Sequence, residues 1–251
     1  GNLPASKRLF LVRHGETEWS LSGQHTSRTD LPLTAEGERR AALLAPVLAG
    51  HSFALALTSP MLRAVRTCEL CGILPQTERS DDLMEWDYGN YEGSTTVEIR
   101  RTRPSWSVFH DGVPGGESVE DVGRRAQRIV NRVVATDGDS IVFSHGHFLR
   151  VLAATWLELA PEDGERLTLD TGTVSILGFE RETRVIRLWK VDPDQRPPSE
   201  STVFGPVANG VREPFPASIG IPSLCIGVPA SNRSPSVVIP MVGRETSRDF
   251  P

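Results

Sequence analysis

Two histidines and two arginines stand at or just after the ends of short apolar runs in this chain. Arg13 and His14 come at the end of one run, Arg63 comes shortly after a second, and His145 and Gly146 follow a third. Arginine binds phosphate through a planar fork of N–H donors and keeps its charge. A neutral imidazole can act as a nucleophile. Together these residue types could hold and transfer a phosphoryl group.

The apolar runs predict the strands that would position these motifs. Buried strands are expected at 7–13, 53–58 and 140–144, and a hairpin is expected from 173–179 and 184–190. The predicted strands alternate with helices, which indicates an α/β sheet covered on both faces. Sites in such sheets form at the carboxyl ends of the strands, so the three motifs are expected to converge there.

Helix signals follow each of the motifs. Ser59 and Pro60 are a suitable N-cap and first-turn pair for one helix, and Ser118 with Asp121 resembles a capping box that opens a longer one. Pro46 should distort the last turn of another helix. The helices are predicted at 34–50, 60–71, from 118 to about 136, and from the second histidine motif to about 159.

Four segments occur in an order that resembles a known family. They are RHGETEW, SPMLRAVRT, EWDYGNYEG and SHGH, and the resemblance, which covers about residues 7–190, is to the phosphoglycerate mutase-like branch of the histidine phosphatase superfamily. The stretch RHGETEWSLSGQHTSRTDLPLT looks most similar to fungal sugar bisphosphatases and related actinobacterial acid phosphatases. The family implies a three-layer α/β/α sandwich with a mostly parallel central sheet.

The resemblance implies a role for each charged residue. His14 would be the nucleophile that becomes phosphorylated, with its far ring nitrogen bonded to a backbone carbonyl, which fixes the tautomer. Arg13, Arg63 and His145 would stabilise the charge on the transferring phosphoryl group. Because His145 contributes a full charge only when protonated, it is expected to shape the alkaline limb of activity. These residues need no metal ion and no cofactor.

Glu85 occupies the position of the acid in this family. A sugar alkoxide is a poor leaving group, so it needs a proton, and Glu85 would later deprotonate the attacking water. Burial beside a phosphate dianion should favour its protonated form, which predicts an acidic to neutral optimum. The residues expected to contact phosphate or substrate are Ser20, His25, Thr26, Tyr88 and Gly146, and Trp19 is expected to wall the pocket.

Other interpretations of single motifs were weighed against this one. His145 and His147 could be a metal pair, although no carboxylate cluster lies near them in the sequence. Cys68 and Cys71 could be a redox pair, but inside a helix pattern simple packing is favoured. A basic segment at 100–103 could hold a second phosphate through Arg100, Arg101 and Arg103, or could be a solvated helix face.

Two other functions fit parts of the pattern. A phosphoglycerate mutase would need extra basic residues and a longer cap, whereas only 31 residues separate Glu85 from Glu117. A catalytically weak phospho-ligand binder is the alternative from another class, and the intact set of charged residues counts against it. A phosphatase acting on a small phosphorylated metabolite, a sugar phosphate or bisphosphate, therefore fits best.

Composition sets the remaining expectations. The formal net charge is −5 with no basic block, which disfavours nucleic acid or an anionic membrane as partners. The longest apolar run near the N-terminus, Leu9 to Val12, is far shorter than a signal peptide or a membrane span, so a cytoplasmic protein is expected. The hairpin leaves an oligomer possible.

The chain changes in composition after residue 190. Of the 19 prolines, 11 lie in 191–251, and that segment contains no lysine. We expect a catalytic domain at 1–190 and a proline-rich, poorly ordered tail at 191–251. The apolar stretch 236–242 leaves open that part of this tail packs on the domain or on a partner.

Overall fold

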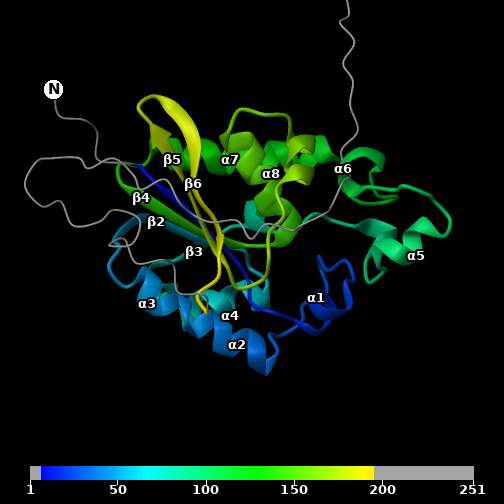
Figure 1. The fold of residues 1–251 in the computed structure, drawn as a ribbon, viewed down its shortest axis with the longest axis horizontal. Helices are drawn as coiled ribbons and strands as arrows, with labels where there is room; N and C mark the ends of the chain where they lie inside the picture. The colour runs from blue at the N-terminus through cyan, green and yellow to red at the C-terminus, as the bar shows by residue number, and fades with distance from the viewer. Residues whose placement is uncertain (1–6, 195–251) are drawn as a thin grey trace, which may run out of the picture. The chain divides into compact units, whose positions relative to one another are not determined.

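The structure of the protein is a computed structural model that describes residues 7–194. A six-stranded sheet lies between two layers of helices (Figure 1). The strands are β1 Leu9–Arg13, β2 Phe53–Thr58, β3 Glu78–Arg79, β4 Asp139–Ser144, β5 Val174–Glu180 and β6 Thr183–Val191. Almost all of the predicted tail lies outside the described residues, so its order and the domain boundary stay predictions.

The sheet has the strand order β3-β2-β4-β1-β5-β6. The pairs β1·β4, β2·β4 and β2·β3 are parallel, while β5 pairs antiparallel with both β1 and β6. The predicted mostly parallel sheet and terminal hairpin are therefore confirmed. In register, Arg13 is opposite Ser144 and Thr58 is opposite Phe143, so β1, β4 and β2 end side by side. The motifs that follow them necessarily converge.

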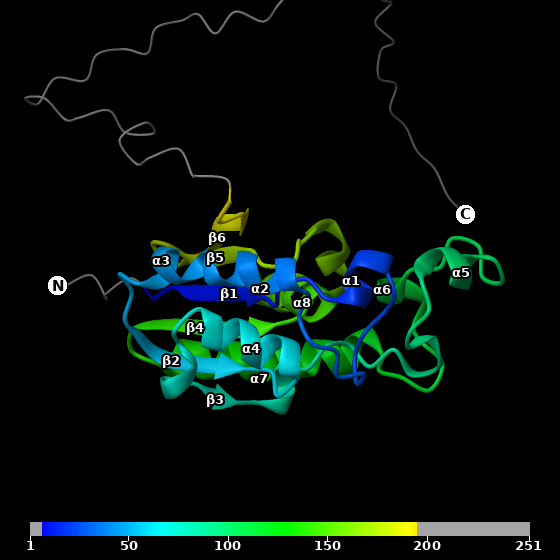
Figure 2. The same ribbon diagram turned by 90° about the horizontal axis from the view of Figure 1, so that it is seen from below.

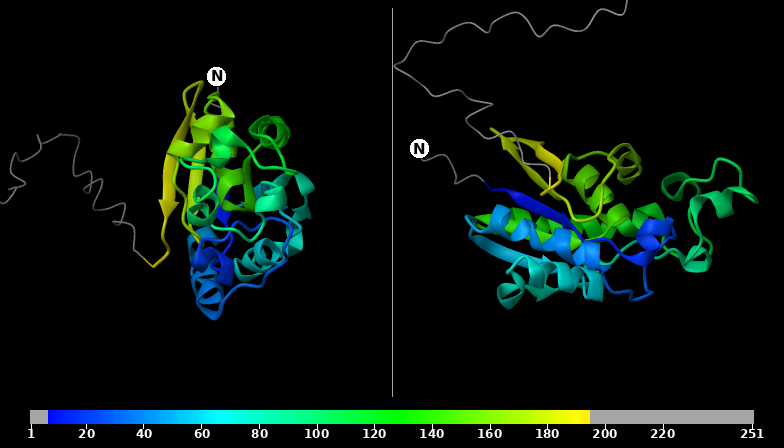
Figure 3. Two further views of the ribbon diagram at one scale, coloured as in Figure 1. Left: turned by 90° about the vertical axis from the view of Figure 1, so that its right-hand side faces the viewer. Right: turned by 60° about the horizontal axis from the view of Figure 1, so that its bottom comes forward.

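Alternation along the strands builds two cores, one on each face of the sheet. In β1, Leu9 and Leu11 point into the core under α7 (Val119–Ala135) and α8 (Gly146–Trp156). Phe10 and Val12 point into the opposite core with residues of α3 (Leu44–Leu48) and α4 (Leu62–Leu70), and α2 (Ala35–Ala42) packs beside both helices. Successive side chains of a strand face opposite sides. Figure 3 shows the resulting three layers.

Two helix predictions need correction. The segment predicted as one helix at 34–50 is two, since α2 ends at Ala42 and α3 begins at Leu44. Pro46 has no N–H to donate to the carbonyl of Ala42, which accounts for the break there. The N-cap of α4 is Met61 and not Ser59, whose hydroxyl accepts the N–H of Met61 and not one from the first turn of the helix. The capping box of Ser118 and Asp121 at α7 is confirmed.

Short helices gather beyond the carboxyl ends of the parallel strands, as Figures 1 and 2 both show. They are α1 Glu18–Ser22, α5 Thr96–Arg100 and α6 Val108–Asp111. A bridge between Gln24 and Thr95 joins the loop after α1 to the start of α5. These elements cover the end of the sheet where the motifs converge.

The segment that carries α5 and α6 begins and ends at a close crossing of two backbone stretches. A Cβ on Gly89 would lie 2.4 Å from the nitrogen of Gly116, and one on Gly116 would lie 2.1 Å from the carbonyl oxygen of Asp87. No side chain fits at either position. Gly89 also has φ +49°, a conformation that glycine adopts without strain. The crossing therefore requires glycine on both stretches.

Cys68 and Cys71 lie buried at α4 and contribute to packing. Burial raises the pKa of the Cys68 thiol to about 11 and that of the Cys71 thiol to about 12, so neither forms the reactive thiolate. This supports the packing interpretation over the redox one. Within residues 7–194, no helix is both long and apolar enough to cross a membrane.

Candidate active site

His14 lies directly after β1 with its ring almost fully buried. Its Nδ1 is 2.7 Å from the carbonyl oxygen of Gly15, which can only accept, so Nδ1 carries the proton. The predicted contact with a backbone carbonyl is therefore present, and Nε2 keeps a free lone pair. Burial, together with the charges of Arg63 and Arg13, lowers the pKa of His14 well below its usual value. The imidazole is neutral and suited to nucleophilic attack.

His145 and Arg63 form a fully buried pair behind His14. The His145 ring lies 5.1 Å from that of His14, and its Nδ1 accepts a hydrogen bond from Arg63 Nε at 3.2 Å. The ring proton is then on Nε2, which donates to Ser59 Oγ at 2.7 Å. Burial and the Arg63 charge lower the pKa of His145 well below its usual value. This argues against the expected cationic His145 and its alkaline limb.

Most of the N–H groups of Arg63 donate to other residues of the protein. Besides His145, its guanidinium donates to the carbonyls of Thr29, Ser27 and Thr26 at 3.0, 3.0 and 3.3 Å. Neither Arg63 nor His145 lines the cavity described below. Their direct contact with phosphate therefore stays a prediction, while the charge of Arg63 is fixed beside the histidine pair.

Arg13 lies at the cavity and is held through one nitrogen of its guanidinium. Its Nη1 donates to the carbonyl of Leu169, while its Nε is buried without a partner among the described residues. Gly146, the first residue of α8, packs against this group, since a Cβ there would lie 3.1 Å from Arg13 Cζ. The absence of a side chain at Gly146 lets the guanidinium lie over the first turn of the helix.

Glu85 binds the N-terminus of α8. Its Oε1 accepts the backbone N–H groups of Trp86 and Phe148, both at 2.8 Å, and its Oε2 accepts that of His147 at 3.0 Å. All three contacts are hydrogen bonds that the carboxylate oxygens accept, so they hold Glu85 at the cavity in a fixed orientation. Its role as acid and base stays a prediction.

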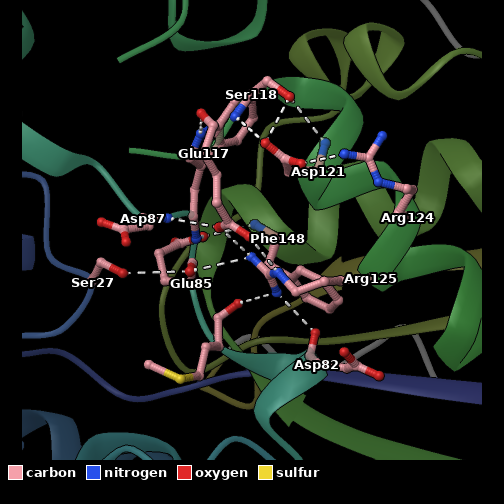
Figure 4. A network of polar contacts seen from close by, with 12 residues as sticks. Ser27, Asp82, Glu85, Asp87, Glu117, Ser118, Asp121, Arg124, Arg125 and Phe148 are labelled. Atoms are coloured by element: carbon pink, nitrogen blue, oxygen red, sulfur yellow. Dashed lines mark hydrogen bonds and ion pairs between the residues drawn. The ribbon is translucent and has the colours of Figure 1, made fainter. Parts of the chain in front are cut away.

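An ion pair that the sequence did not indicate holds the segment around Glu85 (Figure 4). Arg125 on α7 donates to both carboxylate oxygens of Glu117 at 2.7 and 2.8 Å, and to the carbonyls of Asp82 and Met84 at 2.9 Å each. Glu117 Oε2 also accepts the backbone N–H of Asp87 at 2.9 Å. The pair thus ties both sides of residue 85 to α7.

The predicted substrate contacts all line one cavity of about 260 Å³ that also contains His14, Arg13 and Glu85. Ser20 belongs to the capping box of α1 with Thr17, and Thr26 donates to the carbonyl of Gln24 at 3.0 Å. Burial lowers the pKa of His25 to about 4. Trp19 walls the cavity as expected, and the predicted contacts found there are Ser20, His25, Thr26, Tyr88 and Gly146.

Two further basic residues line the cavity, His147 and Arg150. The sequence reasoning weighed His147 as a metal ligand only and did not consider Arg150. Both lie on α8, at positions one and four residues after Gly146, and helical spacing was the signal that could have found them. Arg100, Arg101 and Arg103 do not line it. Arg100 donates to the carbonyl of Trp106, and Arg103 to Tyr91 and Asp111. The second cation of this cavity is therefore Arg150.

Comparisons with known proteins identify relatives of this chain. A family model described as histidine phosphatase superfamily (branch 1) matches residues 9–192. An acid phosphatase of Mycobacterium tuberculosis is 39% identical over 181 residues, which cover 70% of this chain and 89% of the relative. A sedoheptulose 1,7-bisphosphatase of Saccharomyces cerevisiae is 38% identical over 189 residues, which cover 61% of this chain and 68% of the relative. A solved structure from Mycobacterium tuberculosis aligns with a TM-score of 0.72 at 36% identity, covering 74% of this chain and 98% of that one.

Proposed function

Because the chain belongs to branch 1 of the histidine phosphatase superfamily, we propose that it hydrolyses a small phosphorylated metabolite through a phosphohistidine on His14. Its enzyme class, a phosphoric monoester hydrolase, follows from the family and from the phosphatases among its relatives. The observation that carries the proposal is the bond from His14 Nδ1 to the Gly15 carbonyl, which leaves the Nε2 lone pair free in a cavity that also contains Arg13 and Glu85.

The first step transfers the phosphoryl group to the enzyme. The lone pair of His14 Nε2 forms the N–P bond while the bond from phosphorus to the ester oxygen breaks. A protonated Glu85 gives its proton to the leaving alkoxide. Arg13, which lines the cavity beside His14, faces the negative charge that spreads over the equatorial oxygens of the phosphoryl group.

The second step returns the enzyme to its starting state. Glu85, now a carboxylate, takes a proton from water as the water oxygen attacks phosphorus and the N–P bond breaks. The neutral imidazole and inorganic phosphate are the products. The three backbone N–H groups that donate to Glu85 in the structure hold its carboxylate oxygens in place at the cavity. The route requires no metal ion and no cofactor.

The relatives favour a sugar phosphate or sugar bisphosphate as the substrate. One of the two relatives above is named a sedoheptulose bisphosphatase, and the other an acid phosphatase. The cavity of about 260 Å³ suits a metabolite of this size better than a protein segment. Its lining combines guanidinium, imidazole and hydroxyl groups, which match the phosphate and hydroxyl groups of such molecules.

Trapping of the intermediate tests the proposal. Brief exposure to labelled substrate should give an acid-labile adduct on His14, and His14→Ala should lose at least about 1,000-fold in kcat for an aryl phosphate. Full turnover in that variant would refute the proposed nucleophile. With 3-phosphoglycerate, release of free phosphate without isomerisation is expected, whereas isomerisation would identify a mutase. No turnover of any phosphate ester would favour the phospho-ligand binder.

A further inference from the structure

The backbone at His14 is fixed by hydrogen bonds to three separate parts of the chain. The His14 N–H donates to the carbonyl of Ser144 at 3.0 Å, and the N–H of Gly172 donates to the carbonyl of His14 at 3.0 Å. The next N–H along the chain, that of Gly15, donates to a side chain instead, the hydroxyl of Thr67 at 3.0 Å. Of these three bonds, the one to Thr67 is the one that a substitution can remove.

Thr67 lies on α4 with its side chain completely buried. Its hydroxyl donates to the carbonyl of Arg63, one helical turn earlier, at 2.8 Å. A hydroxyl has one donor and two acceptor lone pairs, so it can donate to Arg63 and accept from Gly15 at the same time. Gly15 is buried as well, and a buried N–H that loses its acceptor is unfavourable enough to move its peptide group.

The peptide group between His14 and Gly15 connects this bond to the tautomer of the nucleophile. Its N–H is held by Thr67, and the two residues that it joins carry the two ends of the 2.7 Å contact from His14 Nδ1 to the Gly15 carbonyl oxygen. If this peptide group rotates, the ring and the carbonyl both change position and the contact is lost. The ring proton can then move to Nε2, which removes the lone pair that attacks phosphorus.

Close backbone packing also acts on Gly15. A Cβ on Gly15 would lie 2.6 Å from the carbonyl oxygen of Gly37 on α2, and a Cβ on Gly37 would lie 2.3 Å from the carbonyl oxygen of Glu16. The backbone of α2 is therefore in direct contact with residues 15 and 16. The position of Gly15 is set by this steric contact together with the polar contact from Thr67.

We propose that Thr67 is a positioning residue of the reaction, whose hydroxyl holds the Gly15 N–H so that the Gly15 carbonyl keeps the ring proton of His14 on Nδ1. The inference rests on the proposed function, because it concerns the same nucleophile. Thr67 does not line the cavity, so it acts through Gly15 and not on the substrate.

The order of two substitutions separates this role from packing. Thr67→Val keeps the shape of the side chain and loses the acceptor, whereas Thr67→Ser loses a methyl group and keeps the acceptor. For an aryl phosphate, kcat/KM should fall about 10- to 100-fold in Thr67→Val and less than about threefold in Thr67→Ser. If Thr67 only packs, the valine variant should be the milder one, and that order would overturn the proposal.

Thr155→Val is the matched control for the bond within the helix. The hydroxyl of Thr155 on α8 donates to the carbonyl of Val151, also four residues earlier, at 2.9 Å. Within residues 7–194, it accepts no N–H as Thr67 does. Thr155→Val should therefore keep kcat/KM within about twofold of wild type. A loss as large as that in Thr67→Val would assign the effect to the helix bond and overturn the proposal.

The tautomer of His14 is a readout that packing alone would not move. Nitrogen NMR distinguishes a protonated from an unprotonated ring nitrogen, and His14→Ala identifies the signals of this ring. We expect protonated Nδ1 in wild type and Thr67→Ser, and a measurable fraction with the proton on Nε2 in Thr67→Val. An unchanged tautomer in Thr67→Val would overturn the proposal.

Inhibition by inorganic phosphate separates a changed tautomer from a damaged cavity. The inhibition constant should not rise in Thr67→Val, because Arg13 stays in place and an Nε2–H group of His14 can donate to the bound anion. Weaker inhibition that accompanies the loss of kcat/KM would show general damage to the site and overturn the proposal.

Two further comparisons keep the test decisive. If Thr67→Val does not fold, Thr67→Ala replaces it, because alanine also removes the acceptor, and equal kcat/KM in Thr67→Ala and Thr67→Ser would overturn the proposal. The tautomer measurement needs no turnover, so it does not depend on the proposed function. A wild-type protein that hydrolyses no phosphate ester rejects the proposed function, whereas turnover with an unchanged tautomer in the variant without the acceptor rejects the role of Thr67 alone.

Discussion

Replacing Arg125 by methionine should damage both stability and the acid–base step, because this residue ties the Glu85 segment to α7. The change removes two hydrogen bonds to Glu117 and two to the carbonyls of Asp82 and Met84. It leaves the Glu117 carboxylate, 23% exposed, with the Asp87 N–H. Breaking a fully buried pair costs about 3–5 kcal/mol. With this exposure we expect about 2–4 kcal/mol, or a Tm lower by roughly 5–15 °C.

The effect on activity should depend on the leaving group. If Glu85 shifts when Arg125 is lost, an alkyl phosphate, whose leaving group needs a proton, should lose more kcat than an aryl phosphate. We expect the alkyl-to-aryl ratio to fall about tenfold, measured at a temperature where the variant is fully folded. Glu117→Gln should be milder, because Arg125 keeps its carbonyl acceptors. The matched control is Arg124→Met, the neighbouring exposed ion pair in Figure 4, which should stay within about 0.5 kcal/mol of wild type.

Two results would refute this reasoning. A stability of Arg125→Met equal to that of Arg124→Met would show that the buried pair adds nothing beyond a surface pair. A loss of stability with an unchanged alkyl-to-aryl ratio would show that Arg125 supports the fold without positioning Glu85. Only a joint change in both readouts supports the positioning role.

Three further predictions follow from the site. Glu85→Ala should slow sugar-phosphate hydrolysis at least about 100-fold more than aryl-phosphate hydrolysis, and equal losses in steady-state assays would remove it as the acid. Gly146→Ala should displace the Arg13 guanidinium and lower kcat/KM about tenfold with little change in Tm. Unchanged kinetics would show that the guanidinium can move aside without loss of activity. Burial lowers the pKa of four histidines, which are His14, His25, His145 and His147. Below pH 6.5 the unfolded chain therefore binds more protons than the folded chain. Stability should therefore be fully present above that pH and fall by at least about 2 kcal/mol between pH 6.5 and 5, as urea unfolding would measure. A stability that is flat over this range would contradict the neutral, buried state of these rings.

The part of the fold that the sequence predicted is the part fixed by local patterns. Apolar runs gave β1, β2, β4 and the hairpin β5–β6, and the order of strands and helices gave the layered sheet. The two-residue strand β3 has no such pattern, because both of its side chains are exposed. The sequence predicted a distortion at Pro46, but the break lies earlier, between α2 and α3. It lies there because Pro46 has no N–H to donate to the carbonyl of Ala42.

The site was predictable as far as its motifs follow strand ends. His14 and the His145–Gly146 pair come together because β1 and β4 are parallel and in register. The neutral state of His145 was not predictable, since it depends on Arg63 donating to its Nδ1 across 82 residues of sequence. The position of Arg150 at the cavity was missed because two carbonyls, of Gly164 and Glu165, hold its guanidinium in place. Both carbonyls come from the separate segment after α8.

The glycine crossing at the base of α5 and α6 lets the segment between Gly89 and Gly116 vary without moving the catalytic residues. The loop between Gly89 and Gly116 leaves and rejoins the rest of the domain at one point, so its two ends stay fixed whatever its length. Doubling such a loop adds only about 0.6 kcal/mol of closure entropy. Thr96 on this loop lines the cavity. A transplanted loop would therefore change which substrates enter the cavity while His14, Arg13 and Glu85 stay in place. Swapping residues 90–115 between family members should thus exchange substrate selection as a module.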